Sequence, residues 1–306
     1  MTTTILLGVL AGTLASGVSV LYAALGEVVG QRAGIVNLGI EGVMLVGAAS
    51  SFVIAAVTGN AVLGVLVGAG AGLLFNLILG LLVVTRRTNQ LASGLALWFL
   101  GTGISTMIGV NYTGSNITGL GPIMLPGVDR LPSDVARVFQ QDAFVYCSLP
   151  LALLIAFVLW RTRWGLHLRA VGEDRMSAFA AGLHPDRLQH QALAIAGALY
   201  GLGGAQLALA YTKTWQEGMT SGRGFVAVVI VIFALWRPVR AIWGALLFGG
   251  AVALGLQLQV RGLPISPFLL DMLPYALTLL VVLVFGRPKA FAVPMGLREV
   301  FGGTSK

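Results

Sequence analysis

Residues 61–84 read AVLGVLVGAGAGLLFNLILGLLVV, 24 positions without a charged side chain. At about 1.5 Å of helical rise per residue, this stretch reaches about 36 Å, more than the roughly 30 Å of a bilayer's hydrocarbon core. Its small and polar residues recur at every fourth position, as Gly64, Gly68, Gly72, Asn76 and Gly80. Residues four apart share one face of a helix, so the stretch predicts a transmembrane helix that packs closely through a single stripe.

Similar apolar runs occur on both sides of this stretch. The nine predicted spans are Ile5–Leu25, Val43–Val57, Ala61–Val84, Leu91–Val110, Phe144–Trp160, Gln191–Tyr211, Gly224–Trp236, Ala241–Gln257 and Met272–Phe285. Of the 306 residues, 57% are hydrophobic and only 10% are charged, where about a quarter is usual in soluble proteins. Runs this long without alternation of polar and apolar residues exclude a β-barrel. The sequence therefore predicts an all-α polytopic integral membrane bundle in which residues 1–306 form a single transmembrane domain.

The distribution of Lys and Arg over alternate loops predicts the orientation. If the loop with Arg86 and Arg87 is cytoplasmic, 14 of the 19 basic residues lie on that side. By the positive-inside rule, this places the N-terminus outside and the C-terminus in the cytoplasm. The first four residues contain no basic side chain, so we expect the first span to be kept rather than cleaved as a signal peptide. The formal net charge of +8 thus reflects topology and does not indicate a nucleic-acid partner.

The stretch between the first two spans, Gly26–Gly42, reads GEVVGQRAGIVNLGIEG. Its five glycines make a continuous helix unfavourable, because each costs about 1 kcal/mol relative to alanine inside a helix. Two interpretations remain: an ordinary cytoplasmic loop, or a broken, re-entrant segment that lines protein or a water-filled cavity. The apolar residues between Glu27, Asn37 and Glu41 favour the broken segment.

Polar residues in and beside the spans are candidates for contacts with a solute. Asn76 is interpreted either as an interhelical hydrogen bond or as a solute contact. Asn89 begins the fourth span beside Arg86 and Arg87, where a helix cap is the simpler interpretation. We expect no metal site, because the spacing of His167, His184 and His190 suits no common zinc site.

A short helix is predicted within the longest cytoplasmic loop. Asp174 is placed to cap its N-terminus, and Gly182, followed by Pro185, ends it. The helix carries small residues, which would allow it to dock into a groove on another protein. The whole chain, this loop included, lacks the phosphate-binding motif of nucleotide hydrolases, because none of the three lysines in the sequence follows a glycine.

Four stretches resemble the permease subunits of binding-protein-dependent ATP-binding-cassette (ABC) importers, in the group that serves ribose, other simple sugars and nucleosides. They are GIVNLGIEG at 34–42, RTRWG at 161–165 leading to AVGE at 170–173, AFAAGL at 178–183, and GRGF at 222–225 followed by FALWRP at 233–238. They occur in family order over nearly the whole chain. Asn37, Glu41 and residues 222–225 are more similar to the nucleoside branch. Members with ten spans have an additional N-terminal helix, which this sequence does not contain, and that difference agrees with the orientation above.

The resemblance implies half of a translocation pore in a bacterial cytoplasmic (inner) membrane. Its implied partners are a second permease subunit, homologous or identical, a cytoplasmic ABC ATPase, an external solute-binding protein and the lipid bilayer. The chain itself would have no catalytic residue and no cofactor, because Mg-ATP is used by the ATPase. Glu173, Asp174, Ala178, Ala181 and Gly182 would belong to the coupling helix that contacts the ATPase. Asn37, Glu41, Asn76 and Asn89 would border the solute path.

Other functions remain open at this point. A simple-sugar importer of the same family is the first alternative, because selectivity resides largely in the binding protein. An ion-coupled secondary carrier belongs to another class, although ion relays usually place ionisable residues deep in the spans, where this sequence has almost none. A membrane-embedded enzyme is disfavoured, because no cluster of nucleophile, base and acid is visible in the sequence.

Overall fold

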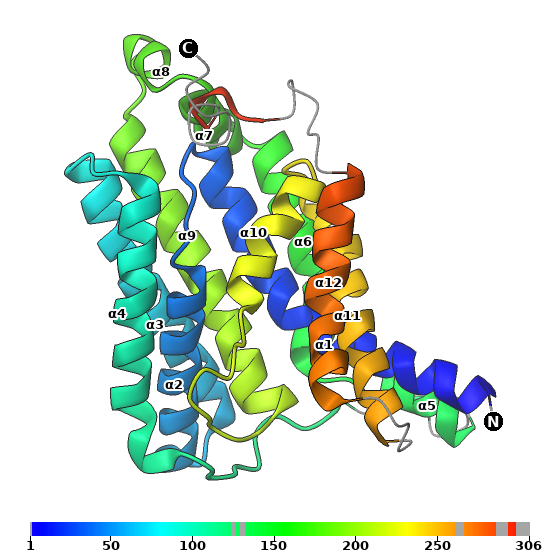
Figure 1. The fold of residues 1–306 in the computed structure, drawn as a ribbon. Coiled ribbons are helices and arrows are strands. Elements are labelled where there is room, and N and C mark those ends of the chain that lie inside the picture. Colours follow the sequence, from blue (N-terminus) through cyan, green and yellow to red (C-terminus); the bar gives the residue numbers. More distant parts are fainter. Residues whose placement is uncertain (1, 124–125, 129–131, 261–265, 286–292, 298–306) are drawn as a thin grey trace.

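The computed structural model describes residues 2–123, 126–128, 132–260, 266–285 and 293–297 (Figure 1). All regular elements in these ranges are helical, apart from two isolated β-bridges that join 113–116 to 214–215. The α-helices are α1 (Thr2–Arg32), α2 (Ile40–Thr58), α3 (Ala61–Gly80), α4 (Gln90–Gly109), α5 (Ser133–Phe139), α6 (Ala143–Arg161), α7 (Arg163–Glu173), α8 (Arg175–Ala180), α9 (Pro185–Gln206), α10 (Arg223–Phe233), α11 (Pro238–Val260) and α12 (Pro267–Phe285). Both α3 and α9 continue into a π-helical turn, at Leu81–Thr85 and Leu207–Tyr211. The all-α prediction is confirmed.

Seven helices of the described part of the chain are long and apolar enough to cross a membrane. They correspond to seven of the nine predicted spans. The other two predictions fall on shorter apolar helices, Arg223–Phe233 and Phe268–Leu280. A multi-pass helical membrane protein is thus supported, but the count of nine full spans is not.

The shortness of α10 has a cause that hydropathy does not reveal. The helix has only 11 residues, although the apolar run continues to Trp236. Leu235 and Trp236 adopt positive φ angles of 51° and 55°, which reverse the chain before α11. Trp236 is 1% exposed, so its indole is retained in the core after the helix has ended.

The glycine stripe of α3 packs directly on α9. A Cβ atom added to Gly72 would lie 2.4 Å from the carbonyl oxygen of Gly197, and one added to Gly201 would lie 2.2 Å from that of Gly68. These approaches are closer than any side chain permits. The predicted stripe of residues 64–80 is therefore confirmed as a packing surface, and its partner is the small-residue face of α9 at Gly197 and Gly201.

The predicted break between the first two spans is confirmed, but it is shorter than expected. Gly26 and Gly30 lie inside α1, and only residues 33–39 leave the helical conformation, with Gly34 at φ +82°. A Cβ atom at Gly26 would lie 2.8 Å from the Tyr200 ring, so this glycine permits a close helix contact and does not break the helix. Residues 33–37 are buried, which favours the broken segment over an ordinary loop. In Figure 1 the chain descends from the end of α1 to begin α2 near mid-depth.

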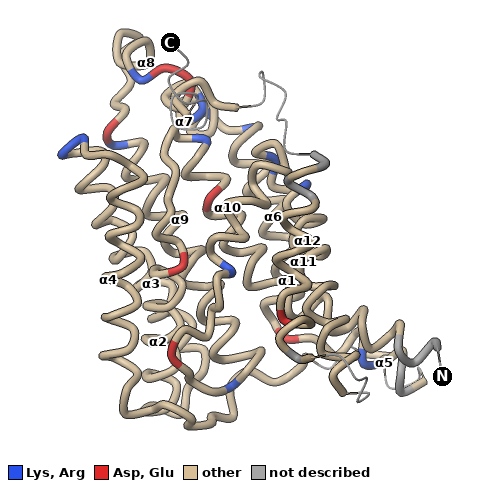
Figure 2. Tube along the Cα trace, viewed as in Figure 1, with Lys and Arg blue, Asp and Glu red and all other residues tan. Residues whose placement is uncertain are grey.

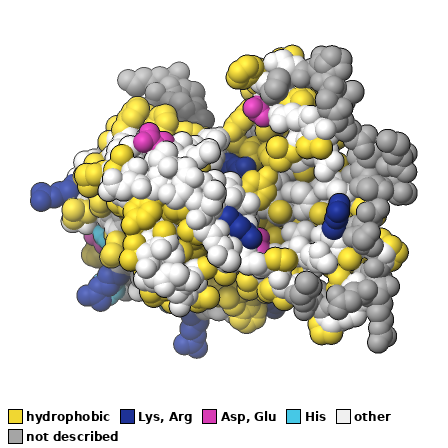
Figure 3. Space-filling model, turned by 90° about the horizontal axis from the view of Figure 1, so that it is seen from below, with side chains coloured by type: hydrophobic (Ala, Val, Ile, Leu, Met, Phe, Trp, Pro, Cys, Tyr) yellow, Lys and Arg dark blue, Asp and Glu magenta, His cyan; other side chains and the backbone are white. Residues whose placement is uncertain are grey.

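The two ends of the bundle differ in charge. Helices α7 and α8 lie at one end, where Figure 2 shows most Lys and Arg residues, whereas α5 lies at the opposite end. Apolar and uncharged side chains cover most of the described surface that is visible from below in Figure 3. Six basic residues lie outside the described residues: Arg130, Arg261, Arg287, Lys289, Arg298 and Lys306.

Candidate functional site

A buried polar network joins the break after α1 to α9. Glu27 is fully buried, and its Oε1 atom accepts hydrogen bonds from Gln31 Nε2 at 2.7 Å and from the Asn37 backbone N–H at 3.1 Å. The Tyr200 hydroxyl of α9 donates to Glu27 Oε2 at 2.5 Å. Buried polar groups cost free energy unless they are hydrogen-bonded, so these contacts fix the break against α9. Glu27 lies in the glycine-rich stretch at 26–42, but it was not among the candidate site residues predicted from the sequence.

Asn37 and Asn76, two predicted path residues, are brought into contact. Asn37 Nδ2 donates to Asn76 Oδ1 at 2.8 Å, and Asn76 Nδ2 donates to the carbonyl oxygen of Leu193 at 2.7 Å. Asn37 Oδ1 accepts from the Gly39 N–H at 2.7 Å. Both side chains are buried and link three segments, so in this conformation Asn76 makes the interhelical hydrogen bond that one of its two interpretations expected.

Glu41, at the start of α2, clamps the loop that precedes α10. Its Oε1 atom accepts from the Thr220 hydroxyl and from the Gly222 N–H, both at 2.6 Å, and its Oε2 atom accepts from the Gly224 N–H at 2.7 Å. A carboxylate at a helix N-terminus satisfies free N–H groups and favourably opposes the helix dipole. Glu41 therefore joins two helices that start inside the bundle.

Arg223, part of the GRGF stretch at 222–225, borders a cavity of about 350 Å³ between α10, α11 and α12. Its Nη1 atom donates to Ser19 Oγ at 3.2 Å, and its guanidinium lies 5.5 Å from the centre of the Tyr211 ring. Among the described residues the single ion pair is elsewhere, between Arg175 and Asp186. Asp271 and Tyr275 also line the cavity. Charged residues so near apolar spans are rare, and the position of Arg223 just before an apolar run is the sequence signal that could have identified it.

Asn89 is not brought to this group. It is exposed and caps α4, where its Oδ1 atom accepts from the Ala92 N–H at 3.0 Å, as the simpler interpretation expected. Its neighbour Gln90 contacts the break instead. Gln90 Oε1 accepts from the Val36 N–H at 3.1 Å, and its Nε2 atom donates to the Gly34 carbonyl at 3.3 Å. Asn89 and Gln90 are adjacent, so their side chains point in different directions. The sequence alone did not show which of the two contacts the break.

The predicted short helix is present as α8, and its ends are as expected. Asp174 Oδ1 accepts from the backbone N–H groups of Met176 at 2.8 Å and Ser177 at 3.2 Å, and Gly182 has φ +83°. The hydrogen bond from the Ser177 hydroxyl, together with these two amides, holds the pKa of Asp174 below its usual value. The charged cap is therefore present at neutral pH and is lost only as the pH falls through that lowered pKa. Glu173, one residue earlier, accepts from the Met295 N–H at 3.0 Å.

The exposed face of α8 differs from the expected one. Ala178 is 4% exposed and packs within the chain, so it cannot also be the surface that seats against a partner. Ala181 and Gly182 are exposed, and Met176 and Phe179 present 74% and 65% of their surface. These two large apolar side chains border a groove of about 490 Å³ with Arg87, Arg175 and Arg187. Met176 and Phe179 were not predicted from the sequence, because close contact with a partner was expected from the small residues of the helix.

The comparisons with known proteins agree with this architecture. Residues 9–282 match the family described as branched-chain amino acid transport system / permease component. TsgC13 of Haloferax volcanii, provisionally named a glucose ABC transporter permease protein, is 40% identical over 85% of this chain and 80% of its own. The guanosine ABC transporter permease protein NupQ of Bacillus subtilis is 32% identical over 92% and 94% of the two chains. The nucleoside ABC transporter permease protein NupC of Lactococcus lactis is 30% identical over 90% and 92%.

The match extends from α1 into α12 and includes the break, the Glu41 clamp and α8. Three relatives named as ABC transporter permeases are at least 30% identical over most of both chains. The chain therefore belongs to the permease-component family of branched-chain amino acid transport systems, as a membrane-embedded permease subunit of the ABC transporter type.

Proposed function

We propose that this chain forms half of the translocation path of an ABC importer whose solute is a nucleoside or a related nucleobase. The observation that carries the nucleoside assignment is the pair of relatives named for guanosine and nucleosides, each of which matches at least 90% of both chains. The higher identity to TsgC13 supports a simple sugar as the alternative solute. Nucleosides contain a ribose ring, so both candidates are neutral, hydroxyl-rich molecules.

The energy for import is proposed to come from partner subunits. A second permease, homologous or identical, completes the path, a cytoplasmic ATPase binds Mg-ATP, and an external binding protein delivers the solute. The end with α7, α8 and most of the basic residues is assigned to the cytoplasm, and the start of α1 at the opposite end is assigned to the outside (Figures 1 and 2). In this arrangement α10 crosses only part of the bilayer. The membrane is taken to be a bacterial cytoplasmic membrane.

Asn37, Glu41 and Asn76 are proposed to shape the inner path from behind, since all three are buried and bonded to protein groups. Arg223, Asp271 and Tyr275 are proposed to face the solute, because they line a cavity that contains both donors and acceptors. A guanidinium and a carboxylate together match the adjacent hydroxyl groups of a sugar ring. Asn89 has no place in this arrangement beyond its helix cap.

The solute is tested most directly on the binding protein encoded beside the gene for this chain. Calorimetry with uridine, adenosine, guanosine, ribose, glucose and galactose should show micromolar or tighter binding of at least one nucleoside. Tight binding of a sugar without any nucleoside binding would replace the nucleoside by the sugar. Vesicles that contain the permease without the ATPase separate the remaining class, because solute accumulation driven by an ion gradient there would indicate a secondary carrier.

The double variant Met176→Ala, Phe179→Ala should reduce binding of the ATPase by about tenfold or more, because two exposed apolar side chains would no longer be buried in the complex. The measurement is co-purification of the ATPase together with solute-stimulated ATP hydrolysis. Gly182→Val should act in the same direction, because φ +83° is unfavourable for a β-branched residue. Phe139→Ala is the matched control, since Phe139 is 44% exposed in α5 at the opposite end. Normal assembly of both α8 variants would show that α8 does not couple the subunits.

A further inference from the structure

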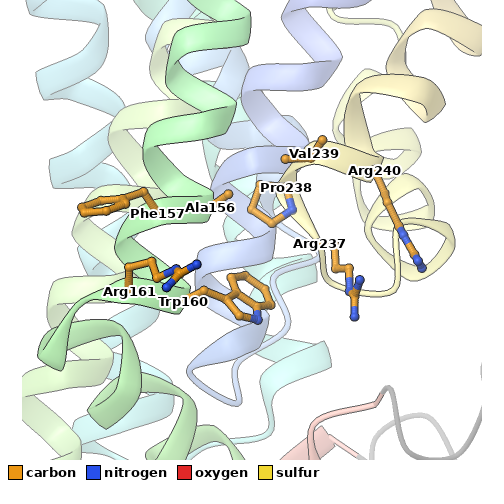
Figure 4. Close-up of a pocket in the computed structure, with 8 residues that line it drawn as sticks. All are labelled: Ala156, Phe157, Trp160, Arg161, Arg237, Pro238, Val239 and Arg240. Atoms are coloured by element: carbon orange, nitrogen blue, oxygen red, sulfur yellow. The ribbon is translucent and has the colours of Figure 1, made fainter.

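A groove of about 620 Å³ lies between the end of α6 and the start of α11, apart from the predicted path and from α8 (Figure 4). Its walls are Ala156, Phe157, Trp160 and Arg161 from α6, and Arg237, Pro238, Val239 and Arg240 from the other side. In Figure 4 the side chain of Arg161 points toward Trp160, and those of Arg237 and Arg240 extend in a common direction. The groove thus combines three guanidinium groups with an apolar surface.

Among the described residues, no Asp or Glu lines the groove, and the one ion pair joins Arg175 to Asp186 on α8 and α9. Arg161, Arg237 and Arg240 are all exposed. Guanidinium groups form paired hydrogen bonds with phosphate oxygens, so this arrangement suits a phosphate group.

Two further arginines lie close to the indole of Trp160. The guanidinium of Arg32 lies 5.1 Å from the ring centre, and that of Arg169 lies 5.5 Å from it. Arg32 also donates through Nε to the carbonyl oxygen of Trp236 at 3.3 Å, which fixes its position. The indole is held in place by these cations, and their charges add to the positive potential in the groove.

The apolar part of the groove continues onto the outer surface of the bundle. Phe157 and Val239 are 59% and 41% exposed, and Trp243, one turn along α11, is 72% exposed. Both α6 and α11 are long enough to cross the membrane, so this surface faces hydrocarbon unless another subunit covers it. Arginine and tryptophan at the end of such helices mark the level of the lipid headgroups.

We propose that this groove binds an anionic phospholipid, phosphatidylglycerol or cardiolipin, from the leaflet on the α7 and α8 side. The headgroup phosphate lies among Arg161, Arg237 and Arg240, and the acyl chains follow Phe157 and Val239 along the bundle. Basic pockets between transmembrane helices with an apolar continuation recognise lipids of this class. A free phosphate ion would use the arginines alone and would gain nothing from the apolar wall.

The test compares lipid retention in native mass spectrometry of the intact permease, purified from nanodiscs that contain phosphatidylglycerol, cardiolipin or phosphatidylcholine. The parent should retain the two anionic lipids in preference to phosphatidylcholine. Arg237→Gln, Arg240→Gln removes two charges and should weaken retention by about 30-fold. The control Arg86→Gln, Arg163→Gln removes two exposed charges that do not line the groove, and it should retain lipid like the parent.

Several results would overturn the proposal. Equal retention of phosphatidylcholine, or equal loss in the control variant, would show that no headgroup site exists here. Stabilisation of the parent by inorganic phosphate to the same extent as by phosphatidylglycerol would assign the groove to a free anion. Loss of a permease dimer in the variant, with lipid retention unchanged, would assign it to a subunit interface. Arg237→Lys, Arg240→Lys keeps the charge and should restore most of the retention, which separates lipid binding from misfolding.

Discussion

Gly72→Val is expected to lower the melting temperature of the purified permease by roughly 6 to 12 °C, or to prevent its accumulation in the membrane. A Cβ atom at this position would lie 2.4 Å from the Gly197 carbonyl oxygen and 2.7 Å from Gly201 Cα. Both contacts are with backbone, which has no rotamer by which to move aside. Forcing α3 and α9 apart is an overpacking change of at least about 3 kcal/mol, from which the temperature shift follows.

The control for this variant lies two residues away on the same helix. Gly70→Val should melt within a few degrees of the parent, because a Cβ atom at Gly70 would have no neighbour within 4 Å. The two substitutions make the same change in volume and helix propensity. Melting curves from size-exclusion chromatography of heated samples measure the difference. Equal melting of both variants would show that α3 and α9 do not meet as closely as described.

Glu41→Ala is expected to reduce the initial rate of solute uptake by about tenfold or more, while the permease still inserts into the membrane. The substitution removes the acceptor of three hydrogen bonds, from Thr220, Gly222 and Gly224, and leaves these donors without a partner inside the bundle. Hydrogen bonds to a charged group contribute about 1.5–3 kcal/mol each, so the start of α10 should lose its fixed position beside Arg223.

Glu41→Gln sharpens this test, since it keeps the shape of the side chain but replaces one acceptor oxygen by a donor. It should also impair uptake, because each carboxylate oxygen of Glu41 faces a backbone N–H group. Glu217→Ala, an exposed change in the same loop, is the control and should leave uptake within about twofold. Uptake by vesicles that contain the assembled importer, together with the amount of permease per vesicle, measures both effects. Unchanged uptake in Glu41→Ala would show that the hydrogen bonds of Glu41 to the loop before α10 are not needed for transport.

The predicted path residues show how far sequence reasoning reached. Asn37 and Glu41 lie in a short glycine-rich stretch, so their inclusion in one segment followed from the sequence. Their partners were not predictable, since Asn76 is 39 positions from Asn37, and Gly224 is 183 positions from Glu41. Local composition does not indicate such hydrogen-bonded pairs, because they form only when separate helices pack.

In the α8 region, too, the sequence predicted local features but not which residues contact the rest of the chain. Asp174 and Gly182 act through their own backbone neighbourhood, so the cap and the stop were predictable from residue type. Which residues of the helix face outward depends on how α8 is rotated against the rest of the chain. Ala178 is buried while Met176 and Phe179 are exposed, the reverse of what side-chain size suggested.

The sequence by itself determined that this is an all-helical membrane protein and that α3 presents a small-residue face, and seven of its nine predicted spans fall on helices long enough to cross a membrane. These features depend on transfer of side chains into lipid and on helical periodicity, which are local properties. Only the tertiary structure decided that α10 ends at Phe233, that Glu41 caps it, and that Arg161 and Arg240 meet across a groove. Each of these depends on contacts between residues far apart in the chain, whose free energy exists only once the bundle has formed.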